Sequence, residues 1–184
     1  MTALRLYARL AGSRANGPGL RAVVWVQGCT LACKGCFNPE THASGGEAVE
    51  VAELLHWLDG LDDVDGLTVS GGEPLQQALG VRDLLAGARA RGLSTLVFSG
   101  YTLAEIEAMA HGSAILATLD VLVAGRYVPA RHQGSALIGS ANQQLHLMSP
   151  RHRLAEFADI AAAEVMIDAA GRVTVSGVDP PRLQ

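Results

Sequence analysis

The three cysteines of this chain lie close together, at Cys29, Cys33 and Cys36. Three thiolates are one short of a closed four-ligand metal site. An iron–sulfur cube held by three cysteines keeps one iron open to a substrate or cofactor, so this count favours reactive chemistry over a structural site. The spacing alone also allows a zinc site in which His42 is the fourth ligand.

A second motif, SGGEP, contains Ser70, Gly71, Gly72 and Glu73. Its two glycines let the backbone approach a ligand closely. Each motif comes at the end of an apolar run that predicts a strand, at residues 21–27 for the cysteines and 66–70 for SGGEP. Since functional groups collect at the carboxyl edge of a parallel sheet, we expect both motifs at that edge.

The elements that must position these motifs alternate along the chain. We expect strands at 21–27, 66–70, 94–98 and 120–123, and helices at 47–58, 76–91 and 102–110. Thr102 and Glu105 form a capping-box pattern at the start of the last helix. Strands that alternate with helices favour an α/β fold with a parallel sheet and right-handed crossover helices, open or curled into a partial barrel. Trp25 and Trp57 are expected to fill the core.

The remainder of the chain is less periodic. Residues 125–144 are rich in Gly, Ser, Arg and Pro and predict a long ordered loop or lid. Residues 163–167 and 172–176 alternate around Asp168 and Gly171, which predicts a C-terminal β-hairpin. We therefore expect a single domain over 1–184, with a core at about 16–124, a lid or partner loop at about 125–150 and the hairpin at about 160–178.

Composition limits the partners of this chain. The net charge is −4 and Lys34 is the single lysine, so the basic excess of a nucleic-acid surface is missing. The sequence contains no apolar run long enough for a membrane span and no signal-peptide pattern at its N-terminus. We expect a soluble cytoplasmic protein without nucleic-acid or membrane partners. In that reducing compartment, clustered cysteines bind metal or do chemistry more often than they form disulfides.

The motifs CTLACKGC and SGGEP resemble the radical S-adenosylmethionine (radical SAM) superfamily. The resemblance extends to NGPGLRAVVWVQGC before the cysteines, CFNPETH after them, FSGYTLAEIE, and GSANQ in the late loop. Within the superfamily, these segments resemble the activating proteins of anaerobic (class III) ribonucleotide reductase and their small relatives. The chain departs from that pattern at Gln144, where the relatives usually carry arginine, and at residues 124–126.

The resemblance implies a partial, open β/α barrel of the radical SAM type. It implies that Cys29, Cys33 and Cys36 bind a [4Fe–4S] cluster, and that the binding site of S-adenosylmethionine (SAM) is formed by Gly35, Phe37, Ser70, Gly71, Gly72, Glu73, Ser99, Gly100 and Tyr101. Glu73 is expected to orient its turn rather than touch the ligand. Asn142 and Gln143 would belong to a loop that meets a partner or substrate.

The activity that the resemblance implies is reductive cleavage of SAM to a 5′-deoxyadenosyl radical. This radical would generate a glycyl radical on a partner enzyme such as anaerobic ribonucleotide reductase, and a reduced carrier such as flavodoxin would supply the electron. A radical SAM enzyme that takes hydrogen directly from a small molecule or peptide is one alternative. A non-catalytic zinc-binding interaction module is the alternative from another class.

Overall fold

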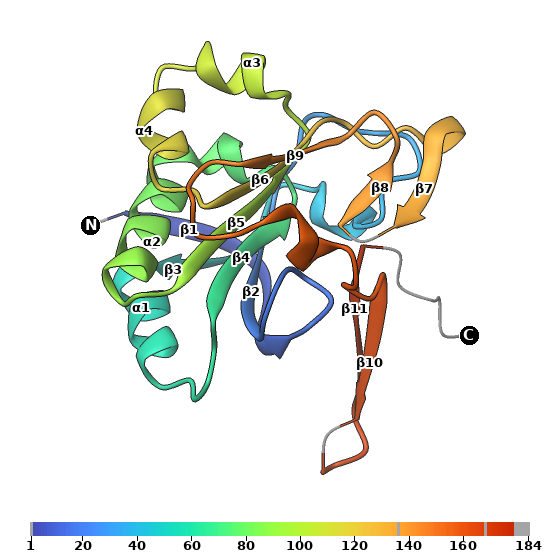
Figure 1. The fold of residues 1–184 in the computed structure, drawn as a ribbon. Helices are drawn as coiled ribbons and strands as arrows, with labels where there is room; N and C mark the ends of the chain where they lie inside the picture. Colours follow the sequence, from blue (N-terminus) through green and yellow to red (C-terminus); the bar gives the residue numbers. More distant parts are fainter. Residues whose placement is uncertain (1, 136, 168, 179–184) are drawn as a thin grey trace.

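The computed structural model describes residues 2–135, 137–167 and 169–178 (Figure 1). Within these residues the main sheet has seven strands in the order β3-β1-β2-β4-β5-β6-β9. Their bounds are β1 Ala3–Ser13, β2 Arg21–Val26, β3 Glu47–Glu50, β4 Gly66–Gly71, β5 Ser94–Ser99, β6 Val121–Ala124 and β9 Gln144–Leu147. The fold is therefore mixed α/β, with one large sheet.

The centre of this sheet is parallel, as predicted, and its edges are not. Strands β2, β4, β5 and β6 run parallel to one another. In contrast, β1 is antiparallel to both β2 and β3, and β9 is antiparallel to β6. The prediction of a parallel sheet is therefore confirmed for the centre and wrong for these edges. The connection between β1 and β2 is too short for a crossover helix, so the two strands pair as antiparallel neighbours.

The helices are α1 Val51–Asp59, α2 Ala78–Ala90, α3 Leu103–Glu107 and α4 Gly112–Leu116. The helix predicted at 47–58 was wrong over its first four residues, which form β3 because they pair with residues 3–6 of β1. The helix predicted at 76–91 begins at Ala78, after the short 3-10 helix η2 Pro74–Gln77. The capping box at Thr102 is confirmed, but the helix it begins ends at Glu107 and the separate helix α4 follows.

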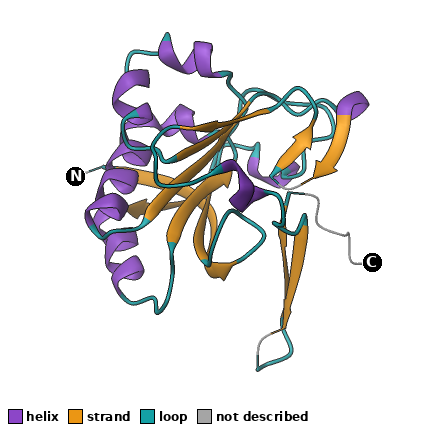
Figure 2. Ribbon diagram, viewed as in Figure 1, coloured by secondary structure: helices purple, strands orange, loops and turns teal. Residues whose placement is uncertain are grey.

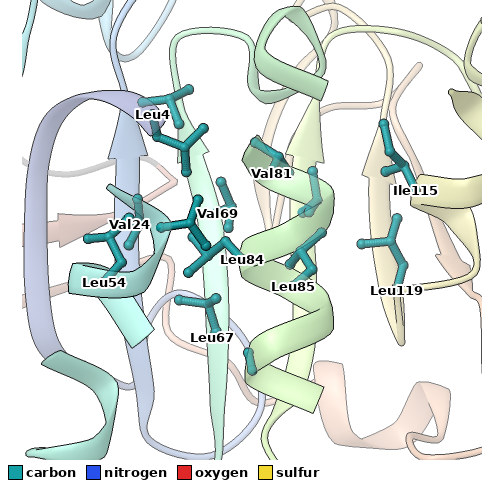
Figure 3. Close-up of a cluster of buried hydrophobic side chains, with 14 of the residues drawn as sticks. Leu4, Val24, Leu54, Leu67, Val69, Val81, Leu84, Leu85, Ile115 and Leu119 are labelled. Atoms are coloured by element: carbon teal, nitrogen blue, oxygen red, sulfur yellow. The ribbon is translucent and has the colours of Figure 1, made fainter. Parts of the chain in front are cut away.

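The two faces of the main sheet carry different hydrophobic clusters. Helices α1, α2 and α4 lie on one side of the sheet, and the small two-stranded sheets lie on the other (Figures 1 and 2). On the helical side, Leu84 and Leu85 of α2 pack over Leu67 and Val69 of β4 (Figure 3). On the opposite side, Leu96 of β5 and Val121 and Val123 of β6 form a second cluster. Two residues from later in the chain, Leu137 and Phe157, complete this cluster.

The later part of the chain contains more regular structure than the sequence predicted. The expected loop 125–144 includes the 3-10 helix η3 Pro129–Arg131 and the strands β7 His132–Ser135 and β8 Ile138–Ser140, which pair antiparallel. Its last residue begins β9, so the lid predicted to extend to residue 150 includes a strand of the main sheet. Further 3-10 helices are η1 Pro39–Thr41 and η4 Leu154–Phe157.

Two strands near the C-terminus, β10 Ala163–Ile167 and β11 Val173–Gly177, pair antiparallel in a separate sheet. We call this pair the β10–β11 ribbon. Asp168, which was predicted to stabilise its turn, lies outside the described residues. Over the part of the chain that the structure describes, no helix is long and apolar enough to cross a membrane.

Candidate functional site

A cavity of about 120 Å³ lies where β2, β4 and β5 end. It brings together Cys29, Cys33, Cys36 and Phe37 with residues 70–73, 99–100 and Gln143. The three cysteines come from the loop after β2, the SGGEP residues from the end of β4, and Ser99 and Gly100 from the end of β5. The expectation that these motifs meet at one edge of the sheet is therefore confirmed.

The cysteine loop is held by its own backbone. The N–H of Gly28 donates to the Thr41 carbonyl at 2.7 Å, and the N–H of Cys29 donates to the His42 carbonyl at 3.1 Å. Within the loop the backbone turns through positive φ at Ala32 (48°) and Gly35 (71°). These bonds close the loop against the segment around η1, and all three cysteines lie on the cavity wall.

The cysteine side chains are half-buried. Burial raises the pKa of the Cys33 thiol, with a further contribution from neighbouring Cys29, and burial also raises the pKa of the Cys36 thiol. Across the described residues, no three His, Cys, Asp or Glu side chains converge closely enough to hold a single metal ion. Three cysteines around a cavity nevertheless suit a [4Fe–4S] cluster of the kind that is held by three thiolates instead of the usual four, so that its fourth iron is open to another ligand.

The two glycines of SGGEP let two backbone segments approach each other. The N–H of Gly72 donates to the Val26 carbonyl at 2.8 Å, and the N–H of Glu73 donates to the Gly28 carbonyl at 2.9 Å. A Cβ at Gly72 would lie 2.3 Å from the Gly28 carbonyl oxygen, which is far inside contact distance. At Gly71 the φ of 103° also favours glycine. The glycine pair thus joins the end of β4 to the start of the cysteine loop.

Glu73 connects the turn after β4 to the turn after β5. Its buried carboxylate accepts hydrogen bonds from Leu75 N–H and Ser99 Oγ, both at 2.9 Å, and from Gly100 N–H at 2.8 Å. Burial raises the pKa of Glu73 to about 7, because desolvation outweighs the hydrogen bonds from Leu75, Gly100 and Ser99. This carboxylate therefore fixes the relative position of two of the turns that line the cavity.

Three predicted site residues lie beside the cavity rather than on its lining. Tyr101 is half-buried, accepts a hydrogen bond from Gln76 Nε2 at 3.2 Å, and lies 5.5 Å from the Arg126 guanidinium. A Cβ at Gly35 would lie 3.0 Å from Pro129 Cγ, so Gly35 faces the later loop. Asn142 donates from Nδ2 to the Arg126 carbonyl at 2.8 Å.

Gln143 holds the late loop at the cavity. Its Oε1 accepts from the N–H groups of Gly139 and Ser140 at 3.0 and 3.1 Å, and its Nε2 donates to the Gly125 carbonyl at 2.9 Å. These bonds connect the turn that follows β8 to the end of β6. Gln143 therefore shapes the cavity wall through the backbone that it organises.

Three aromatic residues of the cavity wall, Trp25, Phe98 and Tyr127, were not assigned to the site from the sequence. Trp25 was predicted to fill the core, but it is half-buried and lines the cavity. The signal was available, because Val24 and Val26 face the helices and successive residues of a strand point to opposite sides. Tyr127 packs on Phe37 with ring centroids 4.5 Å apart, and this contact joins the late loop to the cysteine loop. Trp57, in contrast, packs partly buried against the core, as predicted.

Comparison with known proteins agrees with this geometry. Residues 15–146 match the family described as a 4Fe-4S single cluster domain. An anaerobic ribonucleoside-triphosphate reductase-activating protein of Haemophilus influenzae is 34% identical over 142 residues, which cover 71% of this chain and 90% of the relative. Proteins of the same name from Vibrio cholerae and Escherichia coli are 33% and 32% identical over 141 residues, with the same coverage.

The family match, together with the three cysteines on the cavity wall, identifies a radical SAM protein with a single [4Fe–4S] cluster. Within this class, the chain belongs to the family of the anaerobic ribonucleoside-triphosphate reductase-activating proteins. It is accordingly an enzyme of the activating type, and its cofactors are a [4Fe–4S] cluster and SAM.

Proposed function

We propose that this protein generates a glycyl radical on an anaerobic ribonucleotide reductase. The observation that carries the proposal is the convergence of three cysteines with the turns after β4 and β5 on one cavity, in a chain of the activating-protein family. When bound, the cluster and SAM supply the 5′-deoxyadenosyl radical that removes hydrogen from the partner's glycine.

In this proposal the residues of the cavity hold, position and shield the cofactors. Cys29, Cys33 and Cys36 hold the cluster. Residues 70–72 and 99–100 offer backbone groups and hydroxyls to SAM, and Glu73 keeps these two turns at a fixed separation through its hydrogen bonds. The contact between Phe37 and Tyr127 covers the cysteine loop and helps to exclude water.

We further propose that the parallel strands β2, β4, β5 and β6 form a partial barrel whose open side admits a loop of the partner. Asn142 and Gln143 support this role because they hold the late loop beside the cavity. A reduced carrier such as flavodoxin would deliver the electron, in the cytoplasm. The half-buried position of Tyr101 next to the cavity-lining residues, and the approach of Gly35 to Pro129, agree with supporting roles at the SAM site.

The test is anaerobic reconstitution with iron and sulfide, followed by reduction with SAM and measurement of 5′-deoxyadenosine. Cys33→Ala should abolish the product, because the cluster would lose a ligand. A reductase deuterated at glycine should transfer deuterium into 5′-deoxyadenosine and show a glycyl radical signal by electron paramagnetic resonance.

Transfer of deuterium from a small molecule or peptide instead would favour direct hydrogen abstraction and contradict the activating role. A colourless protein that retains zinc, and loses it on His42→Ala, would contradict radical chemistry altogether.

A further inference from the structure

One face of the β10–β11 ribbon is apolar and exposed. Val165 stands opposite Val175 and Ile167 opposite Val173 in the antiparallel register, so these four β-branched side chains share one face. Val165, Ile167 and Val173 are 52%, 70% and 46% exposed, respectively. Large aliphatic side chains gathered on one exposed face, rather than scattered singly, indicate an interaction surface.

The opposite face of the ribbon is anchored to the body of the protein. The Glu164 carboxylate accepts hydrogen bonds from Ser13 Oγ and from Arg14 N–H, the latter at 3.1 Å. The buried Ser176 hydroxyl accepts a hydrogen bond from Asn16 Nδ2 at 2.6 Å. These polar contacts hold the ribbon in one orientation, with its apolar face away from the protein.

The ribbon is continuous with the cavity wall. Gly177 at the end of β11 and Val178 after it line the same cavity as the cysteines, and so does Asn16. From this edge the ribbon projects away from the main sheet (Figure 1). A protein that inserts a glycine into the cavity would therefore meet the ribbon beside the point of insertion.

The ribbon also lies outside the segment that the family shares. The match to the 4Fe-4S single cluster domain ends at residue 146, whereas β10 begins at Ala163. The cofactor site is thus built before the ribbon begins, apart from the short stretch of cavity wall at 177–178. Such an addition suits the recognition of a partner better than the chemistry of the cofactors.

We propose that the apolar face of the β10–β11 ribbon docks the protein substrate, the reductase that receives the glycyl radical; this inference rests on the proposed function. The occupant is a polypeptide with an apolar segment next to its reactive glycine. The ribbon forms a sheet of its own within the described residues, so its edges offer backbone groups to an extended segment as well.

The test is a double variant, Val165→Asp with Ile167→Asp, in which two exposed anchors become charged. We expect the reductase concentration that half-saturates glycyl radical formation to rise about tenfold, the loss typical of removing anchors from an interface. Formation of 5′-deoxyadenosine without reductase should stay at the wild-type level. Leu79→Asp on α2 is the matched control, because Leu79 is 43% exposed and belongs to a different surface.

A double variant with wild-type half-saturation would overturn the docking proposal. A wild-type dimer that the double variant converts to a monomer, with equal activity on the reductase, would assign the face to a second copy and also overturn it. If the double variant loses 5′-deoxyadenosine formation, the milder single variant Ile167→Ser replaces it in the same measurement. A raised half-saturating concentration of reductase then supports the docking proposal, and an unchanged one overturns it. Wild-type protein that cleaves SAM without forming a glycyl radical on the reductase would instead contradict the proposed function.

Discussion

Each end of the parallel strands has a buried charged residue that connects neighbouring strands. At the amino ends, Arg21 donates to Thr68 Oγ1 at 2.6 Å, to Ser94 Oγ at 2.8 Å and to the Leu67 carbonyl at 2.7 Å. This guanidinium connects the starts of β2, β4 and β5. At the carboxyl ends, the Glu73 carboxylate joins the turns after β4 and β5.

Arg21 contributes to the stability of the sheet, whereas Glu73 contributes to the arrangement of the site. Burial lowers the pKa of Arg21 to about 10, so Arg21 stays charged at neutral pH. Burial raises the pKa of Glu73 to about 7, so Glu73 changes charge in the physiological range. The hydrogen bonds of Arg21 hold three strands together, whereas Glu73 borders the cavity and positions the turns that line it.

Arg21→Met should have the largest effect on stability. The change leaves the Leu67 and Ser94 carbonyls without their guanidinium donor in the interior. We expect a loss of about 4 kcal/mol in the free energy of unfolding, measured by urea titration. Arg5→Met, at an exposed arginine, is the control and should be nearly neutral. Equal stability of the two variants would contradict the role of Arg21 as the anchor of the strand starts.

The pH dependence of stability should show the raised pKa of Glu73. The folded-state pKa exceeds the ordinary value of 4.5, so the contribution of Glu73 is complete below pH 4.5 and is lost as pH rises through about 7. Relative to Glu73→Gln, which does not titrate, wild-type protein should lose about 3 kcal/mol over this range. Thermal unfolding of both proteins across the range measures the difference, and a flat difference would mean that the carboxylate titrates normally.

Gly72→Ala should affect the cavity more specifically. Its Cβ would meet the Gly28 carbonyl oxygen, and a backbone atom cannot rotate away as a side chain can. We expect a loss of about 2 kcal/mol in the free energy of unfolding and a reduced incorporation of the cluster. The absorbance of the iron–sulfur chromophore measures the incorporation. Gly60→Ala is the matched control, since the nearest atom to its Cβ is at 3.6 Å. Normal cluster incorporation in the Gly72 variant would show that the cysteine loop does not need its close contact with the turn after β4.

Arg126→Met should have the smallest effect. Arg126 Nη1 contacts Glu105 Oε2 at 3.0 Å, but both side chains are 42% exposed, so solvent screens the pair. The bond from Arg126, together with those from Thr102, lowers the pKa of Glu105 to about 2. We expect a urea midpoint close to that of wild type, with the small remaining difference removed by high salt. A large decrease in the urea midpoint would show that Arg126 stabilises the fold as Arg21 does.

The sequence predicted the centre of the fold better than its edges. The strands that became β2, β4, β5 and β6 are short apolar runs bounded by turns, and their order placed the motifs at one edge of the sheet. The segment 47–50 has helical spacing, yet it pairs with β1, because pairing with a distant partner overrides local propensity. The position of β9 likewise depends on a neighbour from another part of the chain, because it pairs with β6.

The bond between Glu73 N–H and the Gly28 carbonyl bears on the order in which the protein can mature. During synthesis the cysteine loop leaves the ribosome well before residues 72 and 73, which hold the start of that loop. Since those residues are fixed only when β4 pairs with β2, the cysteines gain their final arrangement after much of the sheet has been translated. Before that point the cysteine loop lacks its final conformation. We therefore expect iron and sulfide to be inserted after the domain has folded, rather than into the nascent chain.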